Sequence, residues 1–391
     1  MKYISDSQSL DRAITSLETA PFVAVDTEFM RETTYWSKLC LIQIASEEHE
    51  YIIDPLAGNI DLGRFYELMT NEAVVKVFHA ARQDVEIFHN QSGKIPRPLF
   101  DTQIAAMVCG YGESAGYETL VREIVNQQLD KSSRFTDWSR RPLSEKQLAY
   151  AIGDVTHLRI IYHTLKQSLE ENNRMHWLDE EMKILTSPET YELEPQDAWK
   201  RLKFRGNNKR THSVLIALAH WRESLAQKHN VPRNRILKDD GLYEISTHPP
   251  RSTGDIARLR GVPRGFDRGP YAKSLIEAVA SGLERKFDTL PEIRNKNHLP
   301  NGLGPTVELL KVALKICCEE HNVAQKLIAT VSDLEQIAAD DKADVKALKG
   351  WRRELFGDNA LKLKHGKLMI GIANGKAKLF DGKTVSVHAP K

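Results

Sequence analysis

The sequence has few cysteines, no long apolar segment and almost no net charge. Its four cysteines are Cys40, Cys109, Cys317 and Cys318, and no pair of them has the C-x-x-C spacing of a zinc site. A disulfide framework is therefore not expected, and a reducing cytoplasm is the predicted location. No segment approaches the roughly 18 apolar residues that a membrane-spanning helix requires. The first residues also lack the apolar core of a signal peptide, so the sequence predicts no membrane association.

The chain does contain enough apolar material for more than one domain. Of its 391 residues, 41% are hydrophobic and 28% are charged, which is typical of soluble globular proteins. A chain of this length favours two or three domains. The formal net charge is only +2, so any surface for nucleic acid must come from local clusters of basic residues.

The most informative segment is a predicted strand that ends in two acids. Four apolar residues from Phe22 to Val25 precede Asp26, and Glu28 follows two residues later. This pattern predicts a strand buried on both faces, and the alternation of side chains places both acids on one side. Adjacent carboxylates repel each other and lose hydration there, which favours a divalent cation between them. The alternative is a strand that ends in solvent with both acids hydrated.

Residues 1–170 alternate predicted strands with predicted helices. The other strands are predicted at 39–45, 51–53 and 74–79, and helices at 62–69, 81–88, 102–108 and 117–126. Because short intervals separate the first three strands, we expect them to be antiparallel neighbours. The sequence therefore predicts an α/β domain with a mixed sheet.

Two predicted helices supply three further candidate site residues. Asp84 lies just beyond the fourth strand, where α/β sheets open to ligands, although the helix dipole alone also explains an acid there. Ser144 and Gln147 form a capping-box pattern that predicts the start of a second helix. On that helix, Tyr150 and Asp154 lie four residues apart and share a face. The alternative for this pair is a tyrosine that covers the core and an acid on the surface.

Together, Asp26, Glu28, Asp84, Tyr150 and Asp154 resemble the signature of a DEDD exonuclease of the DEDDy subgroup. The flanking residues are similar to those of bacterial ribonuclease D. The segments that carry this resemblance are Val25-Asp26-Thr27-Glu28-Phe29-Met30-Arg31, Leu41-Ile42-Gln43-Ile44-Ala45, His79-Ala80-Ala81-Arg82-Gln83-Asp84, Phe100-Asp101-Thr102-Gln103, Trp138-Ser139-Arg140-Arg141-Pro142-Leu143 and Tyr150-Ala151-Ile152-Gly153-Asp154. The resemblance covers residues 1–170 and implies a ribonuclease-H-like fold.

The resemblance also implies a catalytic role for each of the five residues. Asp26, Glu28 and Asp154 would be direct ligands of two divalent cations, Mg²⁺ or Mn²⁺, and Asp84 a ligand that acts partly through water. Two such ions can activate a water and stabilise the leaving oxygen. Tyr150 would orient the attacking water, because a phenol with a pKa near 10 is a poor base at neutral pH. The expected products are nucleoside 5′-monophosphates released from a 3′ end.

Beyond residue 170 the sequence predicts helices joined by a basic segment, 171–209. The candidate RNA-binding residues in and beside it are Lys200, Arg201, Lys203, Arg205, Lys209 and Arg210. Such a run is either a solvated helix face or a patch that contacts phosphates. Its position next to a nuclease domain favours the second interpretation.

An internal repeat follows, in which His229-Asn230-Val231 recurs as His321-Asn322-Val323. Each copy predicts an all-α helical bundle, and the copies occupy residues 210–289 and 301–382. Both resemble HRDC domains, which assist nucleic-acid binding, and the first copy adds Arg222, Arg233 and Arg235 as candidate RNA-binding residues. In the second copy a leucine stands in place of Arg222, so RNA contact by that copy stays open. A pair of scaffold bundles without RNA contact is the alternative.

The sequence therefore predicts a 3′–5′ exoribonuclease domain followed by two HRDC bundles. The resemblance implies a role in maturing the 3′ ends of tRNA precursors and other structured RNA, and no obligate protein partner is indicated. One alternative is a DNA-directed exonuclease, because proofreading domains carry the same acids. A second alternative is a non-catalytic RNA-binding protein on an inactive nuclease scaffold. The presence of all five signature residues argues against this second alternative.

Overall fold

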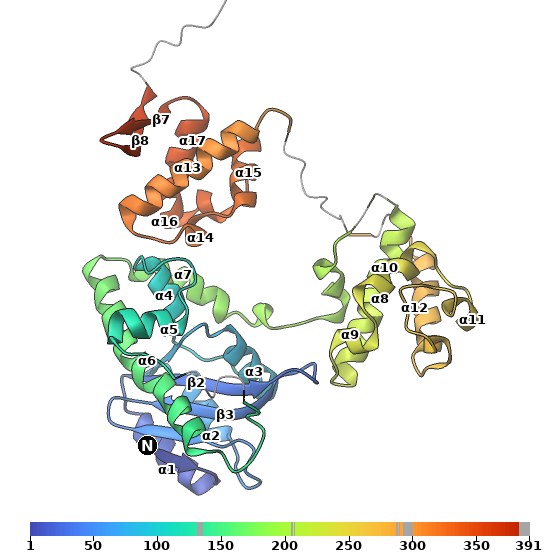
Figure 1. Cartoon of the computed structure of the whole chain (residues 1–391), viewed down its shortest axis with the longest axis horizontal. Coiled ribbons are helices and arrows are strands. Elements are labelled where there is room, and N and C mark those ends of the chain that lie inside the picture. The colour runs from blue at the N-terminus through green and yellow to red at the C-terminus, as the bar shows by residue number, and fades with distance from the viewer. Residues whose placement is uncertain are drawn as a thin grey trace, which may run out of the picture.

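The computed structural model of the chain describes residues 1–130, 136–204, 206, 208–286, 288, 290–291 and 300–382. An α/β domain comprises residues 1–171, a first helical domain residues 208–284 and a C-terminal domain residues 304–382. A connecting segment of residues 175–201 leads from the α/β domain to the first helical domain (Figure 1). Within the described ranges, no helix is both long enough and apolar enough to cross a bilayer.

The α/β domain is built on a six-stranded mixed sheet with the strand order β1-β4-β3-β2-β5-β6. Its strands are β1 (Lys2–Ile4), β2 (Phe22–Met30), β3 (Lys38–Ala45), β4 (Glu50–Ile53), β5 (Val75–Phe78) and β6 (Leu99–Asp101). Strands β2, β3 and β4 are antiparallel neighbours, as predicted, while β1 is parallel to β4 and β5 is parallel to β2 and β6. The sequence did not predict β1 and β6, because three residues are too few to show a strand period.

The helices of this domain lie close to their predicted positions. They are α1 (Ser7–Leu17), α2 (Gly63–Thr70), α3 (Arg82–Ser92), α4 (Thr102–Val108), α5 (Tyr117–Leu120), a π-helical turn (Val121–Val125) and α6 (Glu145–Glu171). The predicted capping box is present, with Ser144 as the N-cap of α6 and Gln147 as its reciprocal partner. Helix α6 packs across β2, β3 and β4, so its inward face is held over the centre of the sheet.

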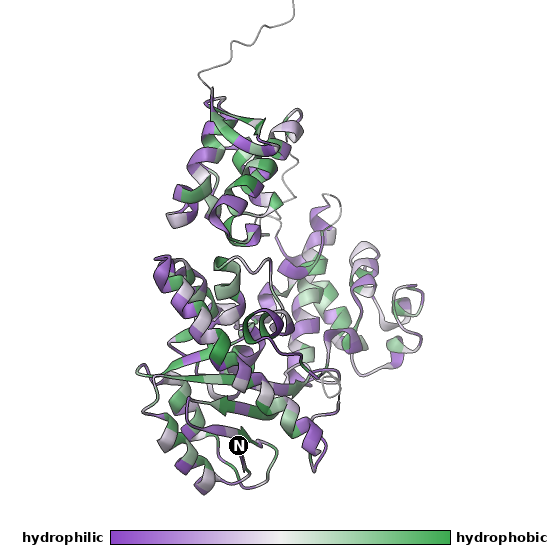
Figure 2. Ribbon diagram, turned by 60° about the vertical axis from the view of Figure 1, so that its left-hand side comes forward, coloured by the Kyte–Doolittle hydropathy of each residue, from purple (hydrophilic) through white to green (hydrophobic). Residues whose placement is uncertain are grey.

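The core of the α/β domain is centred on β2. Residues Phe22, Val23, Ala24 and Val25 are at most 2% exposed, and Figure 2 shows hydrophobic residues concentrated along the strands. Burial of this run stabilises the sheet through removal of apolar surface from water. Because the same strand continues into Asp26, the buried run delivers an acid to the face of the sheet beneath α6.

The described residues of the connecting segment and the first helical domain form helices and loops, without strands. They contain α7 (Met175–Leu185), short 3-10 helices (Pro188–Thr190 and Pro195–Arg201), α8 (Lys209–Lys228), α9 (Arg233–Ile236), α10 (Asp239–Thr247), α11 (Thr253–Ile256), a 3-10 helix (Phe266–Arg268) and α12 (Ala272–Glu284). Helix α8 packs against both α10 and α12. The predicted all-α architecture holds for this domain.

The C-terminal domain is not all-α, which corrects the prediction for 301–382. Its elements are α13 (Gly304–His321), α14 (Gln325–Ile328), α15 (Val331–Ala339), a 3-10 helix (Lys346–Leu348), α16 (Gly350–Arg352), a π-helical turn (Arg353–Gly357), α17 (Asp358–Lys364), β7 (Leu368–Ala373) and β8 (Lys376–Asp381). Strands β7 and β8 form an antiparallel hairpin. Asn374 and Gly375 join them with φ of 52° and 73°, the conformation that favours Asn-Gly in two-residue hairpin turns.

The internal repeat places the same corner of each copy against the α/β domain. Asn230 and Asn322 both have a φ of 49°, and each lies within two residues of the end of a long helix, α8 or α13. The Oδ1 of Asn230 accepts hydrogen bonds from the backbone N–H groups of Tyr35 and Trp36 at 3.1 and 3.0 Å. The Nδ2 of Asn322 donates to the carbonyl of Cys109 at 3.4 Å. Both repeats therefore contact the α/β domain through equivalent asparagines.

The C-terminal domain is also fixed to α7. Trp351 stacks on Trp177 with ring centroids 4.3 Å apart and planes inclined by 7°. The guanidinium of Arg352, which is 4% exposed, forms ion pairs with Glu180 and Glu181. The apolar core of the C-terminal domain is continuous with that of the α/β domain, so the two domains are packed as one body.

Candidate active site

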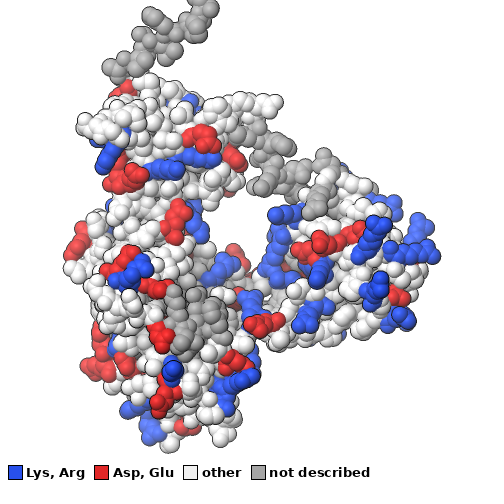
Figure 3. Space-filling view, in the orientation of Figure 1, with Lys and Arg blue, Asp and Glu red and all other residues white. Residues whose placement is uncertain are grey.

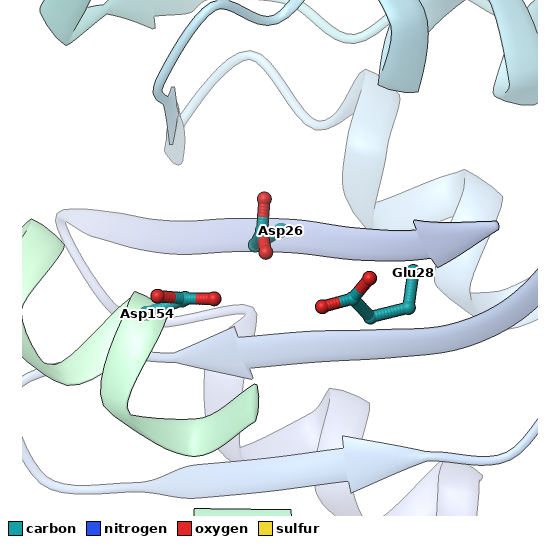
Figure 4. A group of neighbouring side chains, drawn as sticks. All are labelled: Asp26, Glu28 and Asp154. Atoms are coloured by element: carbon teal, nitrogen blue, oxygen red, sulfur yellow. The ribbon is translucent and has the colours of Figure 1, made fainter. Parts of the chain in front are cut away.

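Three of the predicted acids lie together on one side of the sheet. Asp26 and Glu28 project from β2, and Asp154 projects toward them from α6 (Figure 4). One carboxylate oxygen from each residue lies within 4.8 Å of the others. The prediction that strand alternation places Asp26 and Glu28 on one side is confirmed. The register of β2 against β3 shifts between Glu28 and Phe29, so an irregularity in the ladder directly follows the second acid.

Burial raises the pKa of every acid in this cluster. It raises the pKa of Asp26 to about 7 and, together with the charge of Asp26, that of Asp154 to about 8. Burial and then the charges of Asp26, Asp154 and Asp84 raise the pKa of Glu28 to about 9. The metal-free site therefore resists full ionisation, because charged groups lose hydration and repel one another. A cation placed among these oxygens would relieve both penalties.

Asp84 lies in the first turn of α3, as predicted, but behind the other three acids. It is 6% exposed and accepts a hydrogen bond from the hydroxyl of Thr27. Burial, with the charge of Asp26, raises the pKa of Asp84. It does not line the cleft into which Asp26 and Glu28 project. This position fits an acid that acts on the site through an intervening group, rather than a direct ligand.

The turn that presents Asp84 is held by Asp101, which the sequence identified only as part of a motif. Ala80 has a φ of 58°, a conformation that is uncommon for a non-glycine residue. The carboxylate of Asp101 accepts hydrogen bonds from the backbone N–H groups of Ala80 and Ala81 at 3.0 and 2.8 Å. It also accepts from the N–H of Gln103 at 2.8 Å as the N-cap of α4. Asp101 thus fixes the start of α3 to the start of α4.

Tyr150, the fifth predicted residue, lines the cleft one turn before Asp154. Its ring lies against Trp138, which is 2% exposed. The segment that contains Trp138 is fixed by Arg141, whose guanidinium binds both oxygens of Asp54, at 2.6 and 2.5 Å, and the carbonyl of Cys40 at 2.7 Å. The ring of Tyr150 is therefore supported by a segment that is anchored to β3 and β4.

The cleft has a volume of about 460 Å³ and is also lined by Tyr117 and His79, which were not among the predicted site residues. The hydroxyl of Tyr117 donates to the backbone carbonyl of Asp154. The Nδ1 of His79 lies 3.0 Å from the hydroxyl of Thr102, and burial lowers the pKa of His79 to about 4. The imidazole is therefore neutral at physiological pH. Tyr117 reaches the site from α5 and His79 from the end of β5. No local sequence pattern predicts that these two side chains meet.

The donor set of the cleft fits hard divalent cations. The three clustered residues offer only carboxylate oxygens, the ligands that Mg²⁺ and Mn²⁺ prefer. Among the described residues, neither histidine nor cysteine belongs to this cluster, which argues against a zinc site. Burial raises the pKa of all three acids, and neighbouring carboxylates raise those of Glu28 and Asp154 further, so a bound cation would favour their ionised forms.

Most of the predicted RNA-binding residues are exposed. Figure 3 shows basic side chains spread over the first helical domain. The exposed candidates are Lys200, Arg201, Lys203, Lys209, Arg210 and Arg235, and Arg205 lies outside the described residues. Lys200 forms an ion pair with Asp197 at 2.8 Å, and Arg201 lies 3.4 Å from Glu223. The remaining four are available to solvent.

Arg222 does not fit the prediction that it contacts RNA. It is 6% exposed, and its Nη1 donates to the carbonyl of Leu237 at 2.9 Å and to Asp239 at 2.6 Å. Arg233 is half-buried and forms an ion pair with Glu223. The charges of these two arginines are paired with Asp239 and Glu223. The arginines therefore stabilise the first helical domain and its contact with the α/β domain.

Comparisons with known proteins identify the same two modules. Residues 1–170 match the 3′–5′ exonuclease family, and residues 212–279 match the HRDC domain. The chain is 50% identical to ribonuclease D of Nitrobacter hamburgensis over 376 residues, which is 96% of this chain and 98% of the relative. It is 46% identical to ribonuclease D of Bartonella henselae over 377 residues, covering 96% of this chain and 93% of that one.

A solved structure is similar over most of this chain. The crystal structure of Escherichia coli RNase D, described as an exoribonuclease involved in structured RNA processing, has a TM-score of 0.81 to this chain. The two are 28% identical, and the comparison covers 93% of this chain and 98% of that one. With this likeness, the full-length relatives and the cluster of acids, the chain belongs to the ribonuclease D family of metal-dependent 3′–5′ exoribonucleases.

Proposed function

We propose that Asp26, Glu28 and Asp154 hold two divalent cations, Mg²⁺ or Mn²⁺, with Asp84 contributing through water. The observation that carries this proposal is the convergence of three carboxylate oxygens within 4.8 Å from two different elements. The bound ions would supply Lewis-acid stabilisation of the leaving oxygen and lower the pKa of a bound water. The acids would bind and orient this assembly, and their raised pKa values predict that ionisation and cation binding are coupled.

Tyr150 would orient the attacking water by a hydrogen bond from its hydroxyl group. It lines the cleft beside Asp154, and its ring is supported by Trp138. Attack by water on the terminal phosphodiester would release nucleoside 5′-monophosphates one at a time from the 3′ end of RNA. Tyr117 would hold the backbone of α6 at Asp154 through its hydrogen bond to that carbonyl.

The proposed substrates are structured RNA with free 3′ ends, especially tRNA precursors. The solved relative is described as acting in structured RNA processing, and the HRDC match includes the exposed Arg235. Phosphate neutralisation by exposed Lys and Arg side chains would supply affinity without sequence specificity. Candidate contacts are Lys200, Arg201, Lys203, Arg205, Lys209, Arg210 and Arg235.

We further propose the functional division 1–170 for the exonuclease, 171–209 for the basic connection, 210–289 for the first HRDC domain and 301–382 for an HRDC-like domain. The equivalent corners at Asn230 and Asn322 support a common origin of the two helical copies. The four cysteines are unpaired, which supports a reducing cytoplasm as the location.

A digestion assay tests this function. Matched RNA and DNA oligonucleotides labelled at the 5′ end are incubated with the full chain in Mg²⁺, Mn²⁺ or EDTA, and the products are resolved by length and as mononucleotides. We expect a ladder that shortens from the 3′ end of RNA, 5′-monophosphate products, and no reaction in EDTA. Asp154→Asn is the matched inactive control. Faster digestion of DNA than RNA would instead support the proofreading type of exonuclease, and metal-independent digestion would overturn the proposed site.

A further inference from the structure

A completely buried glutamine lies beside the acids of the active site. Gln43, near the middle of β3, is 0% exposed. Neither its Nε2 nor its Oε1 has a hydrogen-bond partner among the described residues. Buried side-chain amides are nearly always hydrogen-bonded, because loss of hydration without a partner is unfavourable. Gln43 therefore calls for an explanation that its packing alone does not give.

The register of the sheet places Gln43 on the face of the metal-binding acids. In the antiparallel ladder of β2 and β3, Gln43 lies directly opposite Asp26, and on the other side it lies opposite Ile52 of β4. Residues directly opposite in such a ladder point to the same face, with Cβ atoms about 4.5–5.5 Å apart. Gln43 thus shares the face of Asp26, and Figure 4 shows that α6 brings Asp154 in front of β3 on that face.

Gln43 does not line the cleft, so it does not touch substrate there. The cleft is bordered by Asp26, Glu28 and Asp154, whereas Gln43 is fully buried on β3, the strand against which α6 packs. A group in this position can hydrogen-bond to the metal-binding carboxylates on the side away from the cleft. Carboxylates that bind a metal are themselves hydrogen-bonded by neighbouring groups, which fix the orientation of the oxygens. An amide carries two N–H donors as well as an acceptor oxygen, so Gln43 can serve this purpose.

We propose that Gln43 is a positioning residue of the metal site, whose amide donates to the Asp26–Asp154 carboxylate pair, directly or through one water, once the cations are bound. This inference rests on the proposed function of these acids. It explains why a polar side chain is kept in an otherwise apolar layer that includes Leu41 and Ile52. It also gives a role to an amide for which the described residues supply no hydrogen-bond partner.

The test is Gln43→Met in the full chain, which keeps the length of the side chain and removes the amide. Mn²⁺ affinity is measured by titration calorimetry without RNA, and kcat and KM are measured on a short RNA in Mg²⁺. We expect Mn²⁺ affinity to fall about 10- to 100-fold, the usual effect of removing such a supporting group. The kcat should fall while KM for RNA stays unchanged, and the melting temperature of the metal-free chain should stay equal or rise. Ile44→Met, one residue along β3 on the opposite face, is the matched control and should change none of the metal-dependent quantities.

Two results would overturn the role of Gln43 while leaving the proposed metal site intact. The first is wild-type Mn²⁺ affinity in Gln43→Met. The second is failure of both Gln43→Met and Gln43→Leu to fold, because an amide without a hydrogen-bond partner among the described residues should not be needed for folding. Absence of Mn²⁺ binding by the unsubstituted chain would instead overturn the proposed metal site, and the inference with it. Calorimetry on the unsubstituted chain and its variants separates these failures.

Discussion

Trp138 lies against Tyr150 with ring centroids 6.1 Å apart and ring planes inclined by 37°. The carbonyl of Trp138 accepts a hydrogen bond from Nη1 of Arg141 at 2.8 Å, and Arg141 forms an ion pair with Asp54 at 2.5 Å. The position of the Tyr150 ring is therefore linked to the end of β4 through a continuous set of contacts. Tyr150 is therefore supported from outside the cleft by the segment that precedes α6.

Tyr150→Phe tests the role of the hydroxyl group. We expect kcat to fall about 10²- to 10⁴-fold, the range for groups that orient or transfer protons to a reacting water. RNA affinity should change little, because the ring that packs on Trp138 is retained. Steady-state kinetics together with equilibrium RNA binding checks this. A fall in affinity at constant kcat would show that Tyr150 acts by packing on the substrate.

Trp138→Leu tests whether the support of Tyr150 matters for the reaction. We expect kcat to fall while Mn²⁺ affinity stays at the wild-type value, because Trp138 packs on Tyr150 and does not line the cleft that the acids border. Trp138→Phe, which keeps an aromatic ring at this position, is the matched control and should retain most of kcat. Both variants are assayed well below their melting temperatures, since loss of a buried indole also destabilises the fold by a few kcal/mol, about 3–5 for truncation to alanine. Equal activity of all three proteins would refute the support role.

The acids predict a stability that declines with pH when metal is absent. In the folded chain, the pKa values of Asp26, Asp154 and Glu28 are about 7, 8 and 9, whereas unfolded carboxyl groups titrate near 4. Between these values the folded chain holds protons that the unfolded chain has released. The free energy of unfolding should therefore fall as pH rises from about 4 to about 9. Thermal unfolding in EDTA across this range measures it.

Asp26→Asn should flatten that pH profile and should abolish hydrolysis. Replacement of the acid removes one buried charge and its repulsion of Glu28 and Asp154, so the metal-free variant should be at least as stable as the wild-type chain near pH 8. Added Mg²⁺ should stabilise the wild-type chain more than the variant, because ligand binding to the folded state raises its stability. A variant that unfolds, or one that retains near-native turnover, would contradict the assignment of Asp26.

Arg235 and Arg222 form a matched pair for RNA binding. Arg235 is exposed, so Arg235→Ala should weaken RNA binding and make the slope of log K against log salt shallower by about 0.7–0.9. Arg222 is buried and bonded to Leu237 and Asp239, so Arg222→Ala should cost about 1–3 kcal/mol of stability and leave the slope unchanged. Binding across a salt series, together with urea unfolding, separates the two effects. A changed slope in Arg222→Ala would restore it as a phosphate contact.

Glu223→Gln tests how the first helical domain is attached. Glu223 is 2% exposed, accepts from the hydroxyl of Tyr35 in the α/β domain and forms an ion pair with Arg233. We expect the substitution to destabilise this contact by about 1–3 kcal/mol, as measured by urea unfolding and by faster proteolysis of the connecting segment. Tyr35→Phe, which removes only the hydroxyl, should have a smaller effect of the same sign.

The same contact has a predictable response to acid. Burial raises the pKa of Glu223, but the hydrogen bonds from Arg233 and Tyr35 outweigh it and hold the pKa below the usual value. This contribution to stability is therefore present above the pKa of an unfolded glutamate and is lost as pH falls through the lower folded value. The acid destabilisation of Glu223→Gln should accordingly be weaker than that of the wild-type chain.

Local features of the sequence determined the catalytic strand and the helix that faces it. The apolar run that ends at Asp26, and the capping box at Ser144, depend on residues close together in the chain, so their patterns predicted β2 and the start of α6. The spacing of Tyr150 and Asp154 likewise fixed their shared face, because helix geometry repeats every few residues. The sequence also contained the Asn374-Gly375 turn signal of the C-terminal hairpin, although the prediction of an all-α bundle overlooked it.

Only the tertiary structure decided which polar groups are buried and what they contact. Arg222 and Arg235 belong to one basic pattern in the sequence, yet packing of α8 against its neighbours buries the first and leaves the second exposed. Asp84 stands behind the other acids because Asp101, on a different strand, holds the turn before α3. Gln43 meets Asp26 only through strand pairing, and Tyr35 meets Glu223 across 188 residues. Which side chains are buried and which groups they contact depends on segments far apart in the chain. The residue pattern within one segment cannot predict these contacts.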